Sequence, residues 1–114
     1  MASSIVASLE KLLGTPRDGA LLRYSLGMEH LKDGDPRRAI GYLREALERE
    51  PGYSAAWKLL GKSLADAGQA AAALEAYRSG IAAAGARGDK QLEKEMSVFA
   101  RRLEKALAAG GPPA

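Results

Sequence analysis

Cysteine is absent from the 114-residue chain, histidine occurs once, and aromatic residues are few. Without cysteine there is no disulfide framework and no thiolate metal ligand, and His30 alone cannot form a multi-histidine site. No apolar run approaches the roughly 20 residues that span a bilayer, and Glu10 and Lys11 interrupt the N-terminal segment where a secretion signal is apolar. We therefore expect a cytoplasmic protein with no membrane segment, no cofactor and no metal.

The chain also lacks a strong excess of either charge. Seventeen Lys and Arg residues face fourteen Asp and Glu residues, which gives a net charge of +3. Such an excess favours solubility and slightly favours acidic partners, but it is far from the dense basic stripe of a nucleic-acid binder. The arginines between positions 37 and 49 alternate with glutamates, which is typical of a solvated helix face. No nucleic-acid partner is expected.

An interval of 34 residues recurs along the chain, and Leu26-Gly27 returns as Leu60-Gly61. Alanine and leucine dominate while β-branched residues are scarce, so helix is the expected state of each unit. A fixed period of this length is typical of stacked repeats, whose units bury their apolar faces against their neighbours. Other pairs at this interval are Ala39 with Ala73, Leu43 with Tyr77, and Leu47 with Ile81. The sequence thus predicts an all-α repeat fold and directs the search for function towards an extended binding surface.

Caps and breakers divide the chain into six expected helices. Asp35-Pro36 is the clearest boundary, because aspartate caps the first turn and proline suits the first helical position. Ser54 and Asp89 are predicted caps of the same kind, and residues 85–88 are predicted to form a loop. The expected helices span about 4–13, 17–34, 36–49, 54–67, 69–84 and 89–109.

Two mid-helix glycines, Gly27 and Gly61, occupy the same position of the two units. A glycine inside a helix costs about 1 kcal/mol relative to alanine, so its repetition indicates a packing role. We expect these glycines to face Ala39 and Ala73 of the partner helices and to bring the two backbones close together. Gly80 is expected to admit the next helix in the same way.

On these residues the chain resembles the tetratricopeptide repeat family. The second unit carries the family pattern as Trp57, Leu60, Gly61, Leu64, Ala73 and Tyr77, and the first carries it as Leu26, Gly27, His30, Ala39, Leu43, Ala46 and Pro51. The resemblance implies a right-handed superhelical stack of antiparallel helix hairpins. Its predicted parts are a domain at 15–109 with repeats at 20–53 and 54–87, a capping helix at 89–109, and a disordered tail at 110–114.

The first repeat departs from the family pattern at Arg23, which stands where the second repeat has Trp57. The amphipathic segment 1–14 is therefore not expected to pack there as a preceding repeat would. We expect it to cover the exposed edge of repeat one. Two alternatives remain open: it folds over the groove as a plug, or it packs on a second copy of the chain.

In the family, the first helices of successive repeats line a concave groove that holds a peptide or a partner helix. The resemblance implies a groove with apolar side chains from repeat one and two lysines, one helical turn apart, that could hold a carboxylate. The apolar stripe of the capping helix, from Leu92 to Ala106, is interpreted as core. It lies one residue out of register with the 34-residue interval, so the groove positions expected in this helix are shifted by one residue. The predicted groove residues are Tyr24, Met28, Leu31, Lys58, Lys62, Ala65, Glu93 and Ser97, with Ala100 as a further contribution.

The predicted function is a non-catalytic protein–protein interaction module, an adaptor or scaffold that binds a peptide or helix, with acidic groups as a possible feature. The alternative is an assembly subunit that associates with itself through the N-terminal helix, as a monomer or weak homodimer. A simpler interpretation of the groove is solvated surface on which Lys62 pairs with Asp66. No catalytic set is found, since His30 is expected to be a packed, hydrogen-bonded core residue. Gly61-Lys62-Ser63 lacks the glycine that a phosphate loop needs at position 56.

Overall fold

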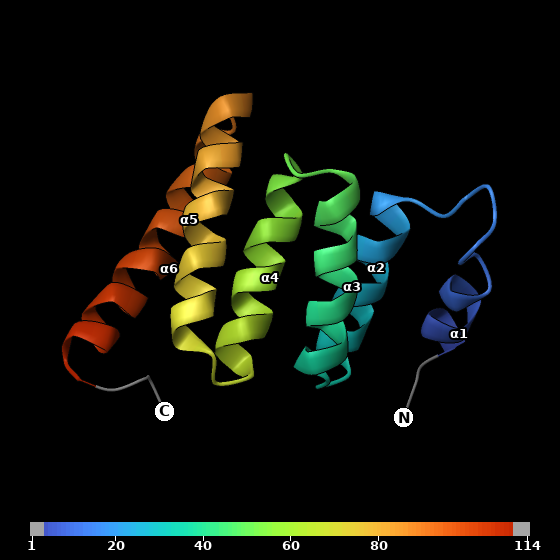
Figure 1. Cartoon of the computed structure of the whole chain (residues 1–114), viewed down its shortest axis with the longest axis horizontal. Helices are drawn as coiled ribbons and strands as arrows, with labels where there is room; N and C mark the ends of the chain where they lie inside the picture. The colour runs from blue at the N-terminus through green and yellow to red at the C-terminus, as the bar shows by residue number, and fades with distance from the viewer. Residues whose placement is uncertain (1–3, 111–114) are drawn as a thin grey trace.

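The computed structural model describes residues 4–110, and these residues form six α-helices (Figure 1). The predicted all-α fold is confirmed. Residues 1–3 of the expected N-terminal segment and 111–114 of the expected tail lie outside the described part of the chain. Among residues 4–110, no helix is long and apolar enough to cross a membrane. The helices are α1 (Ser4–Glu10), α2 (Ala20–Lys32), α3 (Pro36–Arg49), α4 (Ser54–Asp66), α5 (Ala70–Arg87) and α6 (Lys90–Ala108).

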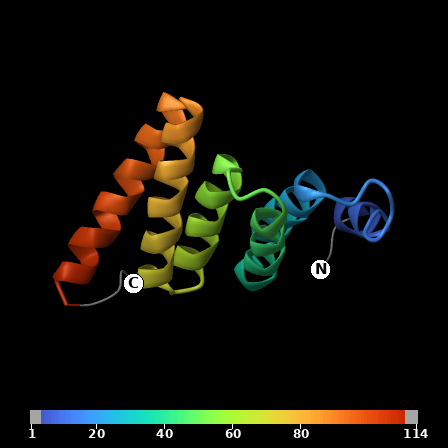
Figure 2. The same cartoon turned by 45° about the horizontal axis from the view of Figure 1, so that its top comes forward.

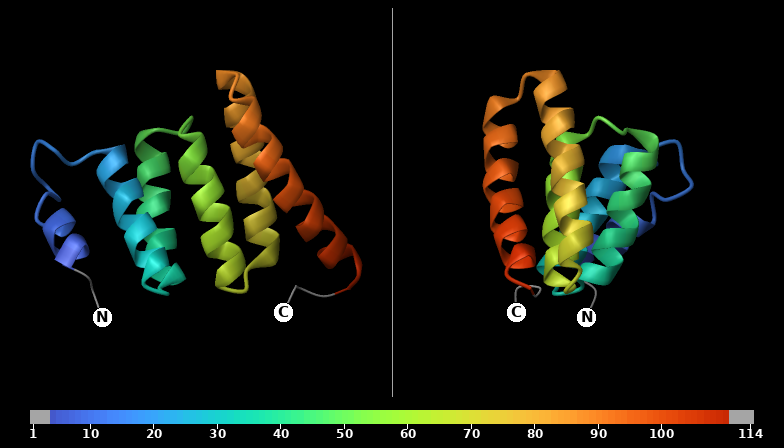
Figure 3. Two further views of the ribbon diagram at one scale, coloured as in Figure 1. Left: turned by 180° about the vertical axis from the view of Figure 1, so that it is seen from behind. Right: turned by 60° about the vertical axis from the view of Figure 1, so that its left-hand side comes forward.

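Helices α2 to α6 stand side by side, and each packs mainly on its neighbours along the chain. Helices α2 and α3 form one hairpin, α4 and α5 form the next, and α6 packs on α5. Helices α2, α4 and α6 share one face of the stack, and α6 crosses in front of α5 when the molecule is seen from behind (Figure 3). Helix α1 lies at the other end of the stack, joined to α2 by an irregular segment (Figure 2). This alternation places every second helix on a common surface.

Two of the three predicted caps are confirmed. The carboxylates of Asp35 and Asp89 accept hydrogen bonds from the backbone N–H groups of Arg38, at 3.2 Å, and Leu92, at 3.1 Å. The prediction for Ser54 is wrong, because Ser54 is already the first residue of α4. Its buried hydroxyl donates back to the Gly52 carbonyl at 3.4 Å. Serine at this position therefore stabilises the preceding turn.

Three helix boundaries also differ from expectation. Helix α1 ends at Glu10 and α2 begins only at Ala20, because Asp18 is held in the connecting turn by the backbone N–H of Gly14 and the side chain of Arg23. Helix α5 continues through the expected loop at 85–88 to Arg87. Only Gly88, with a φ of +74°, leaves the helix there. The alanines before it favour helix, so the left-handed residue sets the end.

The repeated glycines make close contacts with the partner helices, and for Gly27 the predicted partner Ala39 is among its three nearest neighbours. A Cβ atom on Gly27 would lie 2.7 Å from Leu43 Cγ, and one on Gly61 would lie 2.6 Å from Tyr77 Cε1. The carbonyl oxygen of Ala39 would lie 3.4 Å from the Gly27 Cβ, but the nearest atoms at each glycine belong to the large side chain one turn further along the partner helix. For Gly61 the three nearest atoms are all in Tyr77, so the predicted partner Ala73 is not among them. The expectation for Gly80 is confirmed, since a Cβ there would lie 2.7 Å from Trp57 Cβ and would also meet Met96.

The buried residues form two separate clusters. The larger cluster runs through α3, α4, α5 and α6 and includes Leu43, Leu64, Tyr77 and Met96. The smaller cluster joins α1 to repeat one, with Val6 fully buried against Leu22 and Leu26. Helix α1 thus covers the edge of repeat one, as expected from the sequence.

Candidate functional site

A hollow lies on the face shared by α2, α4 and α6. Its volume is about 710 Å³. Apolar and aromatic groups make up most of its wall, and charged groups from α4 stand at its edge. The lining residues are Tyr24, Ala55, Lys58, Leu59, Lys62, Ala65, Asp66, Tyr77, Leu92 and Phe99. We call this hollow the groove.

The deepest aromatic ring of the groove belongs to Tyr77 of α5. Its side chain is only 3% exposed, and its ring stacks on Phe99 of α6 with centroids 5.5 Å apart. Burial raises the pKa of Tyr77 to about 12, so the phenol is neutral at physiological pH. Gly61 of α4 leaves the space that this ring occupies. The small residue of the repeat pattern therefore allows a residue of the second layer to reach the groove.

An ion pair joins the α4 and α6 walls of the groove. Lys58 Nζ lies 2.6 Å from Glu95 Oε1, and the other Glu95 oxygen accepts a hydrogen bond from the Gln91 amide at 3.1 Å. The hydrogen bond from Lys58, followed by that from Gln91, lowers the pKa of Glu95 below its ordinary value. Both side chains of the pair are more than a third exposed, which places the pair at the mouth of the groove.

Lys62 stands one helical turn after Lys58 on the same wall. Its Nζ lies 3.5 Å from Asp66 Oδ2 within α4, and its side chain is 60% exposed. A contact of this length on an exposed face is a weak ion pair, so it does not fix the lysine against its own helix. Lys62 therefore remains available to a ligand at the rim.

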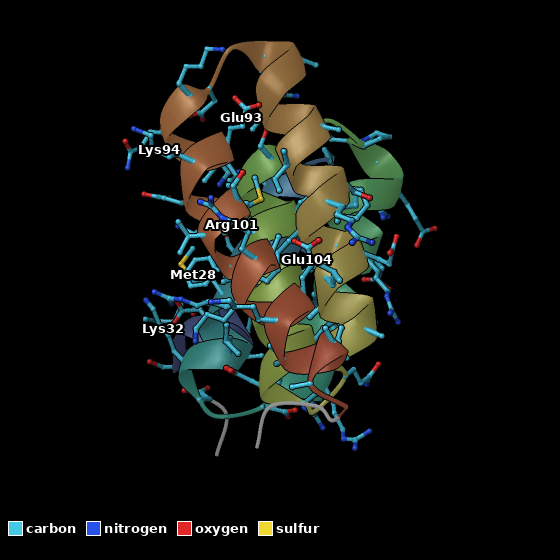
Figure 4. All side chains as sticks on the ribbon, turned by 90° about the vertical axis from the view of Figure 1, so that its left-hand side faces the viewer. Met28, Lys32, Glu93, Lys94, Arg101 and Glu104 are labelled. Carbon is cyan, nitrogen blue, oxygen red and sulfur yellow. The ribbon has the colours of Figure 1, made fainter. Side chains whose placement is uncertain are left out.

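Four of the eight predicted groove residues line the groove: Tyr24, Lys58, Lys62 and Ala65. Tyr24 packs on Tyr53 with ring centroids 5.0 Å apart. Met28 and Leu31 lie further along α2, where both are partly buried and Leu31 packs against the larger core cluster. Figure 4, viewed along the stack from the α6 end, shows Met28 and Lys32 of α2 on the same side as Lys94 of α6. Met28 thus belongs to the groove face of the stack but not to the groove lining.

The residues predicted from α6 do not line the groove. The Glu93 carboxylate lies beside Gly85 of α5, 3.1 Å from where a Cβ would stand (Figure 4). The Ser97 hydroxyl donates to the Glu93 carbonyl at 2.8 Å, and Ala100 is buried. The α6 side of the groove is formed instead by Leu92 and Phe99, with Glu95 between them in sequence.

The sequence did contain the signal for these missed residues. Leu92 and Phe99 stand two repeat intervals after Tyr24 and Leu31, so the uncorrected 34-residue register leads to them. The one-residue shift followed the apolar stripe of α6 and therefore selected the wrong face. Ala55 and Leu59 of α4, also missed, lie three residues before and one residue after Lys58 on the same helix.

A second hollow of about 650 Å³ lies on the opposite face, between α3 and α5. Arg44, Glu48 and Glu75 surround it, and Trp57 and Leu60 form its base. Trp57 is fixed there by its indole N–H, which donates to the Pro51 carbonyl at 2.8 Å. The mixed charges around this second hollow are typical of a solvated face.

His30 is packed in the core, but its expected hydrogen bond is not found. Its side chain is 3% exposed and its ring stacks on Tyr42, with centroids 5.4 Å apart and an angle of 8°. Within residues 4–110, Nε2 has no hydrogen-bond partner. In the same part of the chain, no three His, Cys, Asp or Glu side chains lie close enough to hold a metal ion.

Arg23 anchors the segment that connects α1 to the stack. Its guanidinium contacts both carboxylate oxygens of Asp18, at 3.1 and 2.8 Å, and Glu45 of α3 at 2.5 Å. The hydrogen bond from Arg23, followed by that from the Gly14 N–H, lowers the pKa of Asp18. Arg23, which occupies in repeat one the position that Trp57 has in repeat two, therefore ties the connecting turn to repeat one.

Comparison with known proteins agrees with this geometry. Residues 24–87 match the model of the tetratricopeptide repeat. A TPR repeat-containing protein of Pseudomonas aeruginosa is 48% identical over 102 residues, which cover 90% of this chain and 97% of that protein.

Solved structures show the same arrangement. The solution structure of a protein from Bordetella parapertussis is 42% identical, with a TM-score of 0.81 over 95% of this chain and 94% of that one. The crystal structure of a tetratricopeptide repeat domain protein from Salinibacter ruber is 27% identical, with a TM-score of 0.72 over 77% of this chain and 98% of that one. The chain belongs to the tetratricopeptide repeat family.

Proposed function

We propose that this protein is a non-catalytic interaction module whose groove binds a peptide or helix of another protein. The observation that carries the proposal is the groove itself, which combines an apolar floor with two lysines on one wall. The family generally mediates protein–protein interaction, which supports the same role. The cytoplasmic location expected from the sequence stays a prediction.

The shape of the groove suits a few anchoring side chains rather than a flat contact. Leu59, Leu92 and Phe99 offer apolar surface around the ring of Tyr77, and Tyr24 closes the α2 end. Aromatic residues in a pocket of this kind commonly carry most of an interface's affinity. The lysines at the rim then favour a partner segment that carries acidic groups.

The test is a selection of peptides from a random displayed library on the immobilised protein, followed by calorimetry with the selected peptides. Tyr24→Ala should weaken binding by about tenfold or more, and Lys62→Ala by about two- to fivefold. Arg44→Ala, on the opposite face, is the control and should bind as the unmodified protein does. Circular dichroism confirms that each variant is folded. Unchanged affinity in both groove variants would remove the groove from the proposal.

Self-association through the N-terminal helix stays an alternative. Val6 of α1 is fully buried against Leu22 and Leu26 of the same chain. The side of α1 that carries Val6 is therefore covered, whereas Ile5 of the same helix is 54% exposed and open to a second copy. Solution mass measured with and without residues 1–14 decides the point, since a dimer that disappears on deletion would support assembly.

A further inference from the structure

The ion pair between Lys58 and Glu95 has a position that ordinary surface ion pairs do not have. Glu95 lies between Leu92 and Phe99 along α6, and both of these residues line the groove. Lys58 lines the groove from α4. The pair therefore connects two helices that are not consecutive in the chain, across the place where a ligand would enter.

The chain already supplies a carboxylate to the groove lysine. Glu95 Oε1 lies 2.6 Å from Lys58 Nζ, and Gln91 orients the other oxygen at 3.1 Å. We propose that Glu95 holds, in the free protein, the place of a partner's carboxylate, so that the groove accepts a segment with an acidic side chain next to an apolar one. This inference rests on the proposed function of the groove.

Exchange of one carboxylate for another is easy at this position. The side chains of Lys58 and Glu95 are 37% and 36% exposed, and an ion pair in contact with water contributes little net stability. A partner whose apolar side chain fills the groove beside Leu92 and Phe99 would exclude water from Lys58. Its own carboxylate would then form the same charge-assisted hydrogen bond in a drier setting, where that bond is stronger.

The charged residues on the α4 wall determine which sign of charge the partner segment should carry. Lys62 stands one turn after Lys58, and its contact with Asp66 is long, at 3.5 Å. Two lysines on one wall attract an acidic segment and, once Glu95 is displaced, repel a basic one. A partner with a basic side chain at this point would instead have to bind Glu95 and leave Lys58 unpaired.

Two blocked peptides test the proposal: acetyl-Ala-Phe-Glu-Ala-amide and the same peptide with Gln in place of Glu. Each is titrated into the ¹⁵N-labelled protein, and the amide shifts of Leu59 and Ala65 report binding in the groove. The unmodified protein should prefer the Glu peptide. Glu95→Gln should raise the affinity for the Glu peptide about two- to fivefold and leave the Gln peptide unchanged.

Glu104→Gln is the matched control, because Glu104 also joins α6 to a neighbouring helix, through Arg78 at 3.3 Å, but away from the groove. This variant should bind as the unmodified protein does. Lys58→Gln should abolish the preference for the Glu peptide, and adding Glu95→Gln to it should then have no effect. Such a cycle assigns the effect to the pair rather than to a looser α6.

The outcomes separate the two proposals. If both peptides shift the groove amides but Glu95→Gln changes neither affinity, or raises both equally, the role of Glu95 is refuted while groove binding stands. If replacing Glu with Lys in the peptide strengthens binding, the proposed negative charge of the partner segment is refuted. If none of the peptides shifts Leu59 or Ala65, the proposed function fails together with this inference.

Discussion

Replacement of Gly61 by alanine isolates the close packing on which each hairpin depends. Gly61 lies inside α4, and an added Cβ would stand 2.6 Å from both Cε1 and Cζ of Tyr77 and 2.8 Å from its Cδ1. Gly41 in α3 is the matched control, because it is also inside a helix but its added Cβ would meet nothing within 4 Å. Both substitutions bring the same intrinsic preference for helix, so only the contact with Tyr77 distinguishes them.

The magnitudes follow from these two environments. Gly41→Ala should stabilise the protein by about 0.5–1 kcal/mol, the helix preference alone. In Gly61→Ala the same gain is opposed by overpacking, which costs about 1–3 kcal/mol when the neighbours cannot move freely. The Tyr77 ring is such a neighbour, since it is 3% exposed and stacked on Phe99. We therefore expect Gly61→Ala to be about 1–3 kcal/mol less stable than Gly41→Ala.

Urea and thermal unfolding followed by circular dichroism measure this difference. For a chain of this size about 1 kcal/mol corresponds to about 4 °C in Tm, so the two variants should differ by about 4–12 °C. Gly27→Ala gives an internal gradation, because its added Cβ would lie 2.7 Å from Cγ of Leu43, an aliphatic side chain with more rotatable bonds than an aromatic ring. It should fall between the other two. Equal stability of Gly41→Ala and Gly61→Ala would refute the packing argument.

Three further predictions concern the stability of the fold and its pH dependence. Arg23→Gln should detach the turn held at Asp18. Backbone amides of α1 should then exchange hydrogen faster, while those of α4 stay protected. Equal exchange in both helices would contradict the anchoring role. The pKa of Asp18 is lowered in the folded chain, so the ionised carboxylate stabilises the fold fully above the ordinary pKa of 3.8, and this stabilisation is lost as the pH falls through the lowered pKa. Asp18→Asn should therefore flatten the acid side of a plot of stability against pH. The pKa of Tyr77 is raised from 10.0 to about 12, so the folded chain keeps a proton that the unfolded chain releases, and the free energy of unfolding should fall as the pH rises from 10 towards 12. Tyr77→Phe should show a shallower fall over that range, and identical slopes would contradict the raised pKa.

The fold was largely predictable from the sequence because its signals are local. Asp35-Pro36 and Asp89 start helices through contacts within one turn, and both were predicted correctly. The boundaries that failed depend on details that hydrophobic spacing does not report, such as side-chain hydrogen bonds in the turn before α2 and the left-handed Gly88 after α5. Asp18 and Arg23 are only five residues apart, but the apolar pattern does not show that Arg23 will hold Asp18 in a turn before α2 begins.

Most of the predicted residues that line the groove come from α4, which has a neighbouring helix on each side. Lys58, Lys62 and Ala65 of α4 lie between α2 and α6, and the family register placed them correctly in the groove lining. Helix α6 has no following helix within residues 4–110, so its register had to be inferred from its contacts with one side of the stack alone. Its stripe was therefore aligned by burial against α5, which shifted the predicted groove residues to Glu93 and Ser97.

Tyr77 is a buried core residue that also lines the proposed groove, and this double position restricts how the protein can change over evolution or by engineering. A substitution that reshapes the deepest part of the groove also alters the seam between α4, α5 and α6, where Gly61 and Phe99 touch the same ring. New binding preferences are therefore easiest to reach through Lys58, Lys62 and Tyr24, which can vary without disturbing that seam. A designer who wishes to redirect this scaffold to another target should randomise those three positions and hold the ring and its glycine constant.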